Sequence, residues 1–197
     1  LSNKFKIIGC LAVKINYGID FWCDGNFIIE DGVTKVNYDC KPSLISIVKD
    51  IRKQDFKGPL LLRFPHITNK QITTLYDTFN SSINEYDYKG KFNAVFPLKV
   101  NQLPNFIHPL VSMGKKYNYG LEAGSKAELV IAMTYNNMGS PITINGFKDK
   151  EMIHLCFIAK SMGHNITIII EGLNELEMII EVLKETKLES PNIGLRV

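Results

Sequence analysis

From residue 91 onward, short apolar segments alternate with longer segments in which apolar residues recur every three or four positions. The short segments favour β-strands, and they lie at residues 92–98, 119–122, 141–145, 166–171 and 192–197. The longer segments have the spacing of helices that bury one face, as in Met152, Ile153, Cys156 and Ala159. Strands that alternate with helices in this way predict a parallel sheet covered by helices.

The five predicted strands share a polar residue at their carboxyl ends. These residues are Lys99, Glu122, Asn145, Glu171 and Arg196, at intervals of 23, 23, 26 and 25 residues. An apolar strand body with a polar carboxyl end is typical of a (β/α)8 TIM-type barrel, in which strand bodies fill the core and strand ends form the active site. A doubly wound sheet also places its site at strand ends, so the period alone leaves both folds open.

The first 90 residues have a different pattern. The predicted elements are a strand at 7–13, a hairpin at 27–38, a helix at 43–53, a strand at 58–65 and a long helix at 68–86. Asp31-Gly32 is a typical hairpin turn, and Ser43 is suited to cap the helix that follows it. Pro65 is expected to end the strand before it, because proline cannot donate a ladder hydrogen bond.

These patterns divide the chain into a β-rich N-terminal segment, residues 1–65, that contributes to a β domain, and the first half of a (β/α) barrel, residues 66–197. A closed barrel has eight strands and typically about 250 residues. Five parallel strands would leave a sheet with open edges. We therefore expect an α/β fold with an incomplete barrel, and we expect the sequence to be the front part of a longer protein.

Composition narrows the possible functions. The chain has 197 residues, 45% of them hydrophobic, and a net charge of +3, which is typical of a soluble globular protein. No run of five like charges gives the electrostatic footprint of a nucleic-acid-binding protein, and no apolar run is long enough to span a membrane. The four widely spaced cysteines indicate reduced thiols, and the histidines lack the spacing of zinc ligands. The dinucleotide fingerprint G-x-G-x-x-G is absent, and "GLEAGSK" is one residue too short for a phosphate-binding loop.

Lys99 is the most informative of the strand-end residues. A lysine in such a place usually reaches solvent along its alkyl stem. Here, however, Leu98 and Val100 flank it, and Pro97 distorts the strand just before it. A lysine amine withdrawn from water is more readily neutral, and only the neutral amine can attack a carbonyl carbon. The pattern therefore indicates a lysine that forms a Schiff base, either with a sugar-like substrate or with pyridoxal phosphate.

The segment "FPLKVNQLPNFIHPLVSMG", residues 96–114, matches the pyridoxal-phosphate attachment pattern of the alanine-racemase-like group of ornithine, diaminopimelate and arginine decarboxylases. Within that group the chain most resembles the biosynthetic arginine decarboxylases, from about Tyr17 to Val197. The resemblance is carried in order by "GPLLLRFPHIT", "FPLKVNQ", "YGLEAGSKAEL", "TINGFKDKEMI", "MGHNITIIIEGLNEL" and "IGLRV".

The resemblance implies a fold-type III enzyme that decarboxylates L-arginine to agmatine, a precursor of spermidine and other polyamines. It implies that Lys99 holds pyridoxal phosphate and acts as the catalytic lysine. It also implies a cytoplasmic homo-oligomer, a dimer or tetramer, that needs Mg²⁺, although no carboxylate cluster in the sequence matches a metal site. The phosphate-binding glycines and the substrate-reading residues of the family lie beyond residue 197.

Further cofactor-binding residues follow from the same resemblance. Glu122 and Arg196 correspond to residues near the cofactor, and they could form an ion pair there or a structural salt bridge of the barrel. Asn101 could contact the cofactor or cap the helix after Lys99. Glu128 lies in the pattern Ser125-x-x-Glu128, for which a helix capping box is the favoured interpretation.

Three alternatives remain open at this stage. The chain could be a non-catalytic homologue or fragment that acts by pairing with another protein, and the presence of Lys99 weighs against this. It could belong to a related ornithine or diaminopimelate decarboxylase. It could also be part of a barrel lyase that uses a Schiff base without a cofactor, although such lysines normally lie on a later strand. In the favoured case we expect residues 1–197 alone to be inactive.

Overall fold

The computed structural model describes residues 18–197, so the strand predicted at residues 7–13 lies outside the described part. The chain divides into two compact units, one ending at Ile67 and the other running from Thr68 to Val197. The sequence placed a division between residues 65 and 66. We describe each unit by itself.

The first unit contains a β-hairpin and two short helices. Its elements are α2 (Ile19–Trp22), β1 (Phe27–Glu30), β2 (Val33–Val36) and α3 (Leu44–Arg52). The hairpin is confirmed, with Asp31 at φ 54° and Gly32 at φ 73°, the two left-handed residues of a tight hairpin turn. The cap of α3 is also confirmed, because Ser43 Oγ accepts a hydrogen bond of 3.0 Å from the Ser46 N–H.

The strand predicted at residues 58–65 is wrong. Residues 58–64 form no strand, and Leu61 is 75% exposed. An apolar run becomes a strand only when a neighbouring strand accepts and donates its ladder hydrogen bonds, and no segment in residues 18–197 does so. Pro65 begins the helix α4 (Pro65–Glu85), since proline is well tolerated in the first turn of a helix.

The predicted long helix is confirmed as α4, and its buried Tyr76 attaches it to the second unit. The Tyr76 hydroxyl accepts a hydrogen bond of 3.1 Å from the Ala94 N–H, and its ring stacks on Tyr117 at 4.6 Å between centroids. Burial raises the pKa of this phenol.

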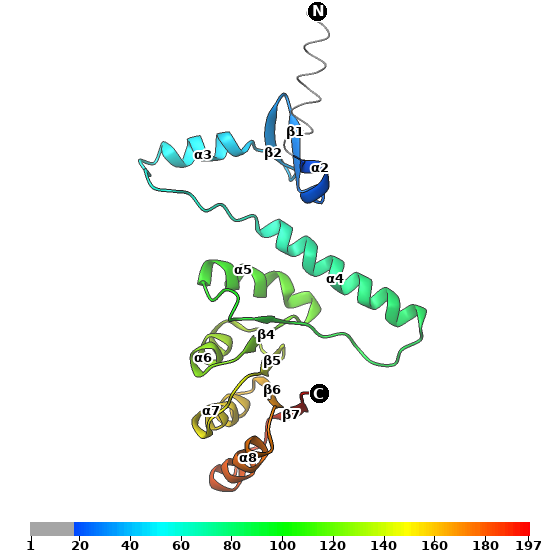
Figure 1. Ribbon diagram of the computed structural model, residues 1–197, viewed down its shortest axis with the longest axis vertical. Coiled ribbons are helices and arrows are strands. Elements are labelled where there is room, and N and C mark those ends of the chain that lie inside the picture. The colour runs from blue at the N-terminus through cyan, green and yellow to red at the C-terminus, as the bar shows by residue number, and fades with distance from the viewer. Residues whose placement is uncertain (1–17) are drawn as a thin grey trace, which may run out of the picture. The chain divides into compact units, whose positions relative to one another are not determined.

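The second unit is a parallel five-stranded sheet covered by helices (Figure 1). Its strands are β3 (Val95–Pro97), β4 (Gly120–Ala123), β5 (Pro141–Ile144), β6 (Asn165–Ile170) and β7 (Asn192–Leu195). The connecting helices are α5 (Pro104–Gly114), the short 3₁₀ helix η1 (Lys115–Tyr117), α6 (Lys126–Tyr135), α7 (Lys150–Ser161) and α8 (Leu173–Thr186). All five predicted strands are confirmed.

The order of the strands decides between the two folds that the sequence left open. Each strand pairs with the next one in the sequence, in the order β3-β4-β5-β6-β7, and α5 to α8 all lie on one face of the sheet (Figure 1). A doubly wound sheet reverses its order at one point and carries helices on both faces. The observed arrangement is instead that of successive strands in a (β/α) barrel.

The core lies between the sheet and its helices. Along β6 the buried residues Ile166, Ile168 and Ile170 alternate with partly exposed ones, as expected when successive side chains point to opposite faces. Helix residues such as Ile153 and Phe157 of α7 are fully buried against this face. The other face of the sheet, which would line a barrel interior, is therefore the less buried one.

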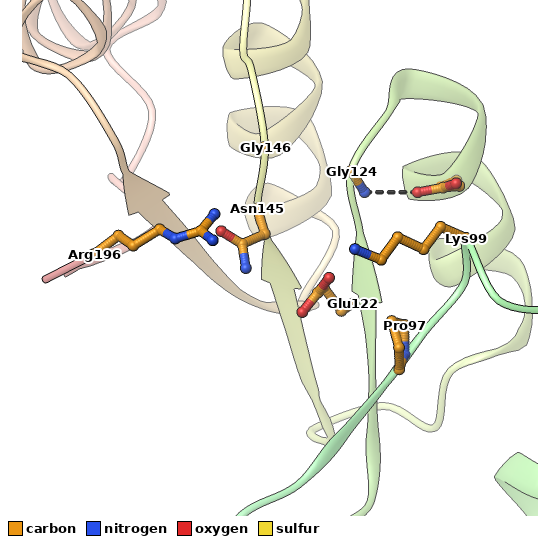
Figure 2. Close-up of a pocket in the computed structure, with 8 residues that line it drawn as sticks. Pro97, Lys99, Glu122, Gly124, Asn145, Gly146 and Arg196 are labelled. Atoms are coloured by element: carbon orange, nitrogen blue, oxygen red, sulfur yellow. Dashed lines mark hydrogen bonds between the residues drawn. The ribbon is translucent and has the colours of Figure 1, made fainter.

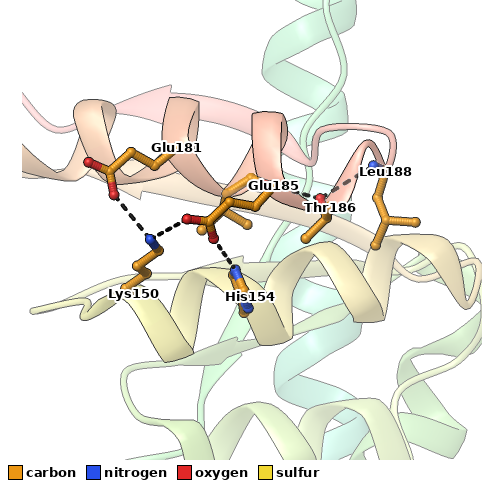
Figure 3. Close-up of polar contacts among 7 residues, drawn as sticks. Lys150, His154, Glu181, Glu185, Thr186 and Leu188 are labelled. Carbon is orange, nitrogen blue, oxygen red and sulfur yellow. Dashed lines mark hydrogen bonds and ion pairs between the residues drawn. The ribbon is translucent and has the colours of Figure 1, made fainter.

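An exposed ion-pair cluster joins the outer surfaces of α7 and α8 (Figure 3). Lys150 Nζ lies 3.2 Å from Glu181 Oε2 and 2.6 Å from Glu185 Oε1, and His154 Nε2 lies 3.3 Å from Glu185 Oε2. Lys150 lowers the pKa of Glu185. Because these groups are exposed, the pairs contribute little to stability.

The amino-terminal edge of the sheet is held by neutral amides. Ser140 Oγ donates to Asn118 Oδ1 at 3.0 Å, Asn165 Nδ2 donates to the Gly139 carbonyl at 3.2 Å, and Asn192 Nδ2 donates to Asn165 Oδ1 at 3.4 Å. In barrels this edge serves stability, whereas the opposite edge carries the chemistry.

The packing of Cys156 predicts its reactivity. Its side chain is fully buried, and burial raises the pKa of its thiol to about 12, whereas Cys40 is exposed. The thiolate, and not the neutral thiol, is the nucleophile that an alkylating reagent modifies. In the native protein at pH 8 we expect iodoacetamide to label Cys40 within minutes and Cys156 only after denaturation, as measured by peptide mass spectrometry. Labelling of both cysteines at equal rates would contradict the packing of α7.

Candidate active site

The carboxyl ends of the parallel strands surround a cavity of about 460 Å³ in the second unit (Figure 2). The residues that line it are Pro97, Lys99, Glu122, Gly124, Glu128, Asn145, Gly146 and Arg196. Three of the four predicted site residues, Lys99, Glu122 and Arg196, therefore line one cavity although up to 97 positions separate them in the sequence.

Lys99 lies in the turn that directly follows β3. The preceding residue, Leu98, is fully buried, and its N–H donates a hydrogen bond of 3.0 Å to the Glu122 carbonyl, which fixes the start of this turn. Figure 2 shows the Lys99 side chain extended toward the cavity. The expectation that Lys99 is withdrawn from water is not met by residues 18–197, which leave it exposed. The reason is that β3 is an edge strand, with a neighbour on one side only.

Glu122 is the third residue of β4. Its neighbour Leu121 is fully buried on the helix-covered face, so alternation places Glu122 on the opposite face. Pro97 of β3 and Thr143 of β5 are its partners across the sheet. This register places the Glu122 carboxylate beside the strand that leads into Lys99.

Glu128 caps α6, as predicted, and it also lines the cavity, which was not predicted. Ser125 Oγ accepts a hydrogen bond of 3.2 Å from the Glu128 N–H, and Glu128 Oε2 accepts one of 2.7 Å from the Gly124 N–H. The reciprocal bond of a capping box normally goes to the cap residue itself, and here it goes to the residue before it. Glu128 Oε1 also accepts from Gln102 Nε2 at 2.9 Å, so both carboxylate oxygens have partners.

Arg196 pairs with Glu171, so the hypothesis of an Arg196–Glu122 ion pair is wrong. Arg196 Nη1 lies 2.9 Å from Glu171 Oε1 on the adjacent strand end. Glu122 is on β4, three strands from Arg196, and neighbouring strands are about 4.8 Å apart, so the two backbones are separated by roughly 14 Å. The Arg196 guanidinium, helped by the Gly146 N–H, lowers the pKa of the Glu171 carboxyl.

Asn145 and Gly146 lie in the loop that follows β5, with Gly146 at φ 79°. Their place in the cavity wall was not predicted. Asn145 Oδ1 is buried and has no hydrogen-bond partner within residues 18–197. The polar residue at the carboxyl end of this strand was the available signal in the sequence.

Asn101 does not line the cavity. Its Oδ1 accepts a hydrogen bond of 3.0 Å from the Leu103 N–H, two residues ahead, which is a local turn leading into α5. The predicted alternative of a helix cap is wrong, because the N-cap residue of α5 is Leu103 and no side chain caps this helix.

The described part of the chain places no cluster of metal-binding side chains at the cavity. Within residues 18–197, no group of three or more His, Cys, Asp or Glu side chains could hold a metal ion. The same part of the chain contains no helix of the length and apolarity needed to cross a membrane.

Comparison with known proteins shows what this geometry is similar to. No protein-family profile matches the chain. The chain is 36% identical to the biosynthetic arginine decarboxylase of Prochlorococcus marinus strain AS9601, over 98% of its own length and 31% of the relative's length. It is 37% identical to the biosynthetic arginine decarboxylase of Rhodopirellula baltica, over 92% of its own length and 28% of the relative's.

A solved structure gives the same answer. The crystal structure of the biosynthetic arginine decarboxylase SpeA from Campylobacter jejuni matches 92% of this chain with a TM-score of 0.89 and 62% sequence identity. The chain is similar to a portion of the biosynthetic arginine decarboxylases. That portion is about three tenths of the length of these relatives.

A more distant structure supports the fold alone. The diaminopimelate decarboxylase from M. jannaschi matches 87% of the chain with a TM-score of 0.63 and 23% identity. The five strands of this chain therefore correspond to part of the fold of both structural neighbours.

The Arg196–Glu171 pair predicts a defined dependence on pH. The pKa of Glu171 is lowered in the folded state, so the pair contributes stability above the unfolded pKa of about 4.3, and this contribution is lost as pH falls through the lower folded pKa. We expect a double-mutant cycle of Glu171→Gln and Arg196→Met, measured by urea unfolding, to give a coupling free energy between the two residues. This coupling free energy should be constant from pH 7 to pH 5. It should shrink only below about pH 4.3. A coupling that fades between pH 7 and pH 5 would contradict this arrangement.

Proposed function

We propose that this chain supplies the cofactor-binding lysine of a pyridoxal-phosphate-dependent enzyme that decarboxylates L-arginine to agmatine. The observation that carries the proposal is the convergence of Lys99, Glu122 and Arg196 on one cavity at the carboxyl edge of a decarboxylase-like sheet. The substrate is taken from the names of the relatives, which are biosynthetic arginine decarboxylases. The homo-oligomeric state, the cytoplasmic location and the role in polyamine synthesis belong to the same proposal.

The cavity fits pyridoxal phosphate in size and in chemistry. Its volume of about 460 Å³ lies within the usual range for a small-molecule site. Lys99 offers a primary amine for the cofactor aldehyde, and Arg196 offers a guanidinium. The unpartnered Asn145 Oδ1 is a buried acceptor that lacks the donor that such atoms normally have.

Each residue has a distinct task in this proposal. Lys99 would hold pyridoxal phosphate through its primary amine, which reaches the cavity wall. Glu122 lines the same cavity and could act there as a hydrogen-bond or proton acceptor, whereas both oxygens of Glu128 already accept from Gln102 and Gly124. Arg196, oriented by Glu171, brings positive charge to the same wall. Pyridoxal phosphate supplies the electron sink for the electron pair left when carbon dioxide departs.

The attachment role of Lys99 can be tested directly. In the purified protein that contains this chain, we expect pyridoxal phosphate to give a visible absorbance band, and borohydride to fix the cofactor on the peptide that contains Lys99. Lys99→Ala removes the nucleophilic amine, so both signals should disappear. Lys115→Ala is the matched control, because Lys115 is an exposed lysine after α5 and does not line the cavity. A cofactor adduct that survives in Lys99→Ala would refute the assignment.

Catalysis should require more than these 197 residues. Residues 18–197 leave Lys99 exposed, and an active site excludes water to strengthen its electrostatic interactions. We expect the isolated segment to release no ¹⁴CO₂ from carboxyl-labelled arginine, and the full-length protein that contains it to release it from arginine in preference to ornithine. Turnover by residues 1–197 alone would contradict the first expectation, and a preference for ornithine would contradict the second.

A further inference from the structure

A buried ion pair lies directly behind the wall of the cavity. Lys148, in the loop between β5 and α7, is fully buried, and its Nζ lies 3.1 Å from Oε2 of Glu175, which is 3% exposed. The neighbouring Phe147 is 83% exposed. Charged side chains are usually exposed and aromatic side chains are usually buried, and these two positions show the opposite arrangement.

Both charged groups are used to hold backbone groups of the two loops that follow β5 and β6. Lys148 Nζ donates to the Gly146 carbonyl, and Glu175 Oε1 accepts from the Lys148 N–H at 3.3 Å. Glu175 Oε2 accepts from the Glu171 N–H at 2.9 Å. The pair thus joins the loop that carries Asn145 and Gly146 to the loop that carries Glu171.

These contacts continue to the cavity. The Gly146 N–H donates to Glu171 Oε1 at 2.9 Å, and the same oxygen accepts from Arg196 Nη1 at 2.9 Å. Gly146 is therefore held at its carbonyl by Lys148 and at its N–H by Glu171. Arg196, Asn145 and Gly146 all line the cavity, whereas Lys148 and Glu175 do not.

Stability alone is a weak reason for such a pair. Two charges lose their hydration on burial, and well-packed apolar residues of similar volume are often as stabilising as a buried ion pair. The loop before α6 also shows that a carboxylate can hold the same backbone position without a lysine. Glu128, like Glu175 the third residue of its helix, accepts from the N–H four residues earlier, and its partner is the neutral Gln102.

We propose that Lys148 and Glu175 are positioning residues for the cofactor site, which fix Asn145 and Gly146 and, through Glu171, the Arg196 guanidinium. This inference rests on the proposed function. Lys148 and Glu175 contact neither substrate nor cofactor in this proposal. They act by holding Asn145, Gly146 and Arg196 in position.

The test compares two matched double variants of the full-length protein. Lys148→Met/Glu175→Gln removes the buried charges while conserving volume. Lys150→Met/Glu185→Gln removes the same residue types from the exposed cluster between α7 and α8 (Figure 3). Three quantities are measured for each: the thermal midpoint without cofactor, the dissociation constant of pyridoxal phosphate from its visible absorbance, and hydrogen exchange of backbone peptides without cofactor.

For Lys148→Met/Glu175→Gln we expect the cofactor dissociation constant to rise about tenfold, as is typical when groups that orient a site are removed. Exchange should accelerate in the peptide spanning residues 145–149 and stay unchanged in the β6 strand, with the thermal midpoint close to that of the wild type. Lys150→Met/Glu185→Gln should match the wild type in all three measurements.

Unchanged cofactor affinity and unchanged exchange at residues 145–149 in the folded buried-pair variant would overturn the inference. So would faster exchange throughout β6 and α8 with a lowered midpoint, because that pattern indicates a general stabilising role. If the variant does not fold, Glu175→Asp keeps the charge but shortens the side chain by one methylene, and it should show the same changes in smaller degree. If the wild type binds no pyridoxal phosphate, the proposed function fails, and exchange at residues 145–149 still decides whether the pair positions this loop.

Discussion

Parallel pairing of consecutive strands is the constraint on which the rest of this structure depends. When each strand lies beside the next and points the same way, residues 23 to 26 positions apart in the sequence come together at one edge. Lys99 and Glu122 illustrate this, since the turn after β3 is fixed by a hydrogen bond from Leu98 to the Glu122 carbonyl. The backbone ladder thus determines which side chains lie at this edge.

At the two edges of the sheet, different side chains form hydrogen bonds with the backbone groups of the loops. At the carboxyl edge, carboxylates accept from the loop N–H groups: Glu128 from Gly124, Glu171 from Gly146, and Glu175 from Glu171. At the amino edge, asparagine amides do the equivalent work, with Asn165 donating to the Gly139 carbonyl. Two of these three carboxylates lie beside a cation, Glu171 beside Arg196 and Glu175 beside Lys148, whereas Glu128 pairs with the neutral Gln102.

The sequence predicted the elements of the second unit well because their patterns are local. Five strands, their order of appearance and the capping role of Glu128 follow from apolar spacing and from the motif Ser125-x-x-Glu128. The error at residues 58–65 has a physical origin, because strand formation depends on a partner that the local sequence does not describe.

Contacts between side chains far apart in the sequence could not be predicted, because they too depend on partners that the local sequence does not describe. The polar strand ends were identified, but which cation meets which carboxylate depends on strand order, and Arg196 meets Glu171 on the adjacent strand instead of Glu122. Lys148 and Glu175 gave no signal, since a lysine in a loop beside an acidic helix start is ordinarily a solvated residue.

The inverted burial of Phe147 and Lys148 connects the fold to the cavity. A loop of this length could have turned its aromatic ring inward and its ammonium outward, and the ordinary preference favours that choice. Turning the ammonium inward becomes favourable only if the Glu175 carboxylate and the Gly146 carbonyl are both there to receive it. The contacts of Lys148 with Glu175 and the Gly146 carbonyl therefore select the conformation of the loop between β5 and α7, and with it the position of Asn145. Apolar packing alone would not select one conformation. A hydrophobic substitute could fill the same space, but it would leave the Gly146 carbonyl without its donor, and several backbone positions would then fit the same packing.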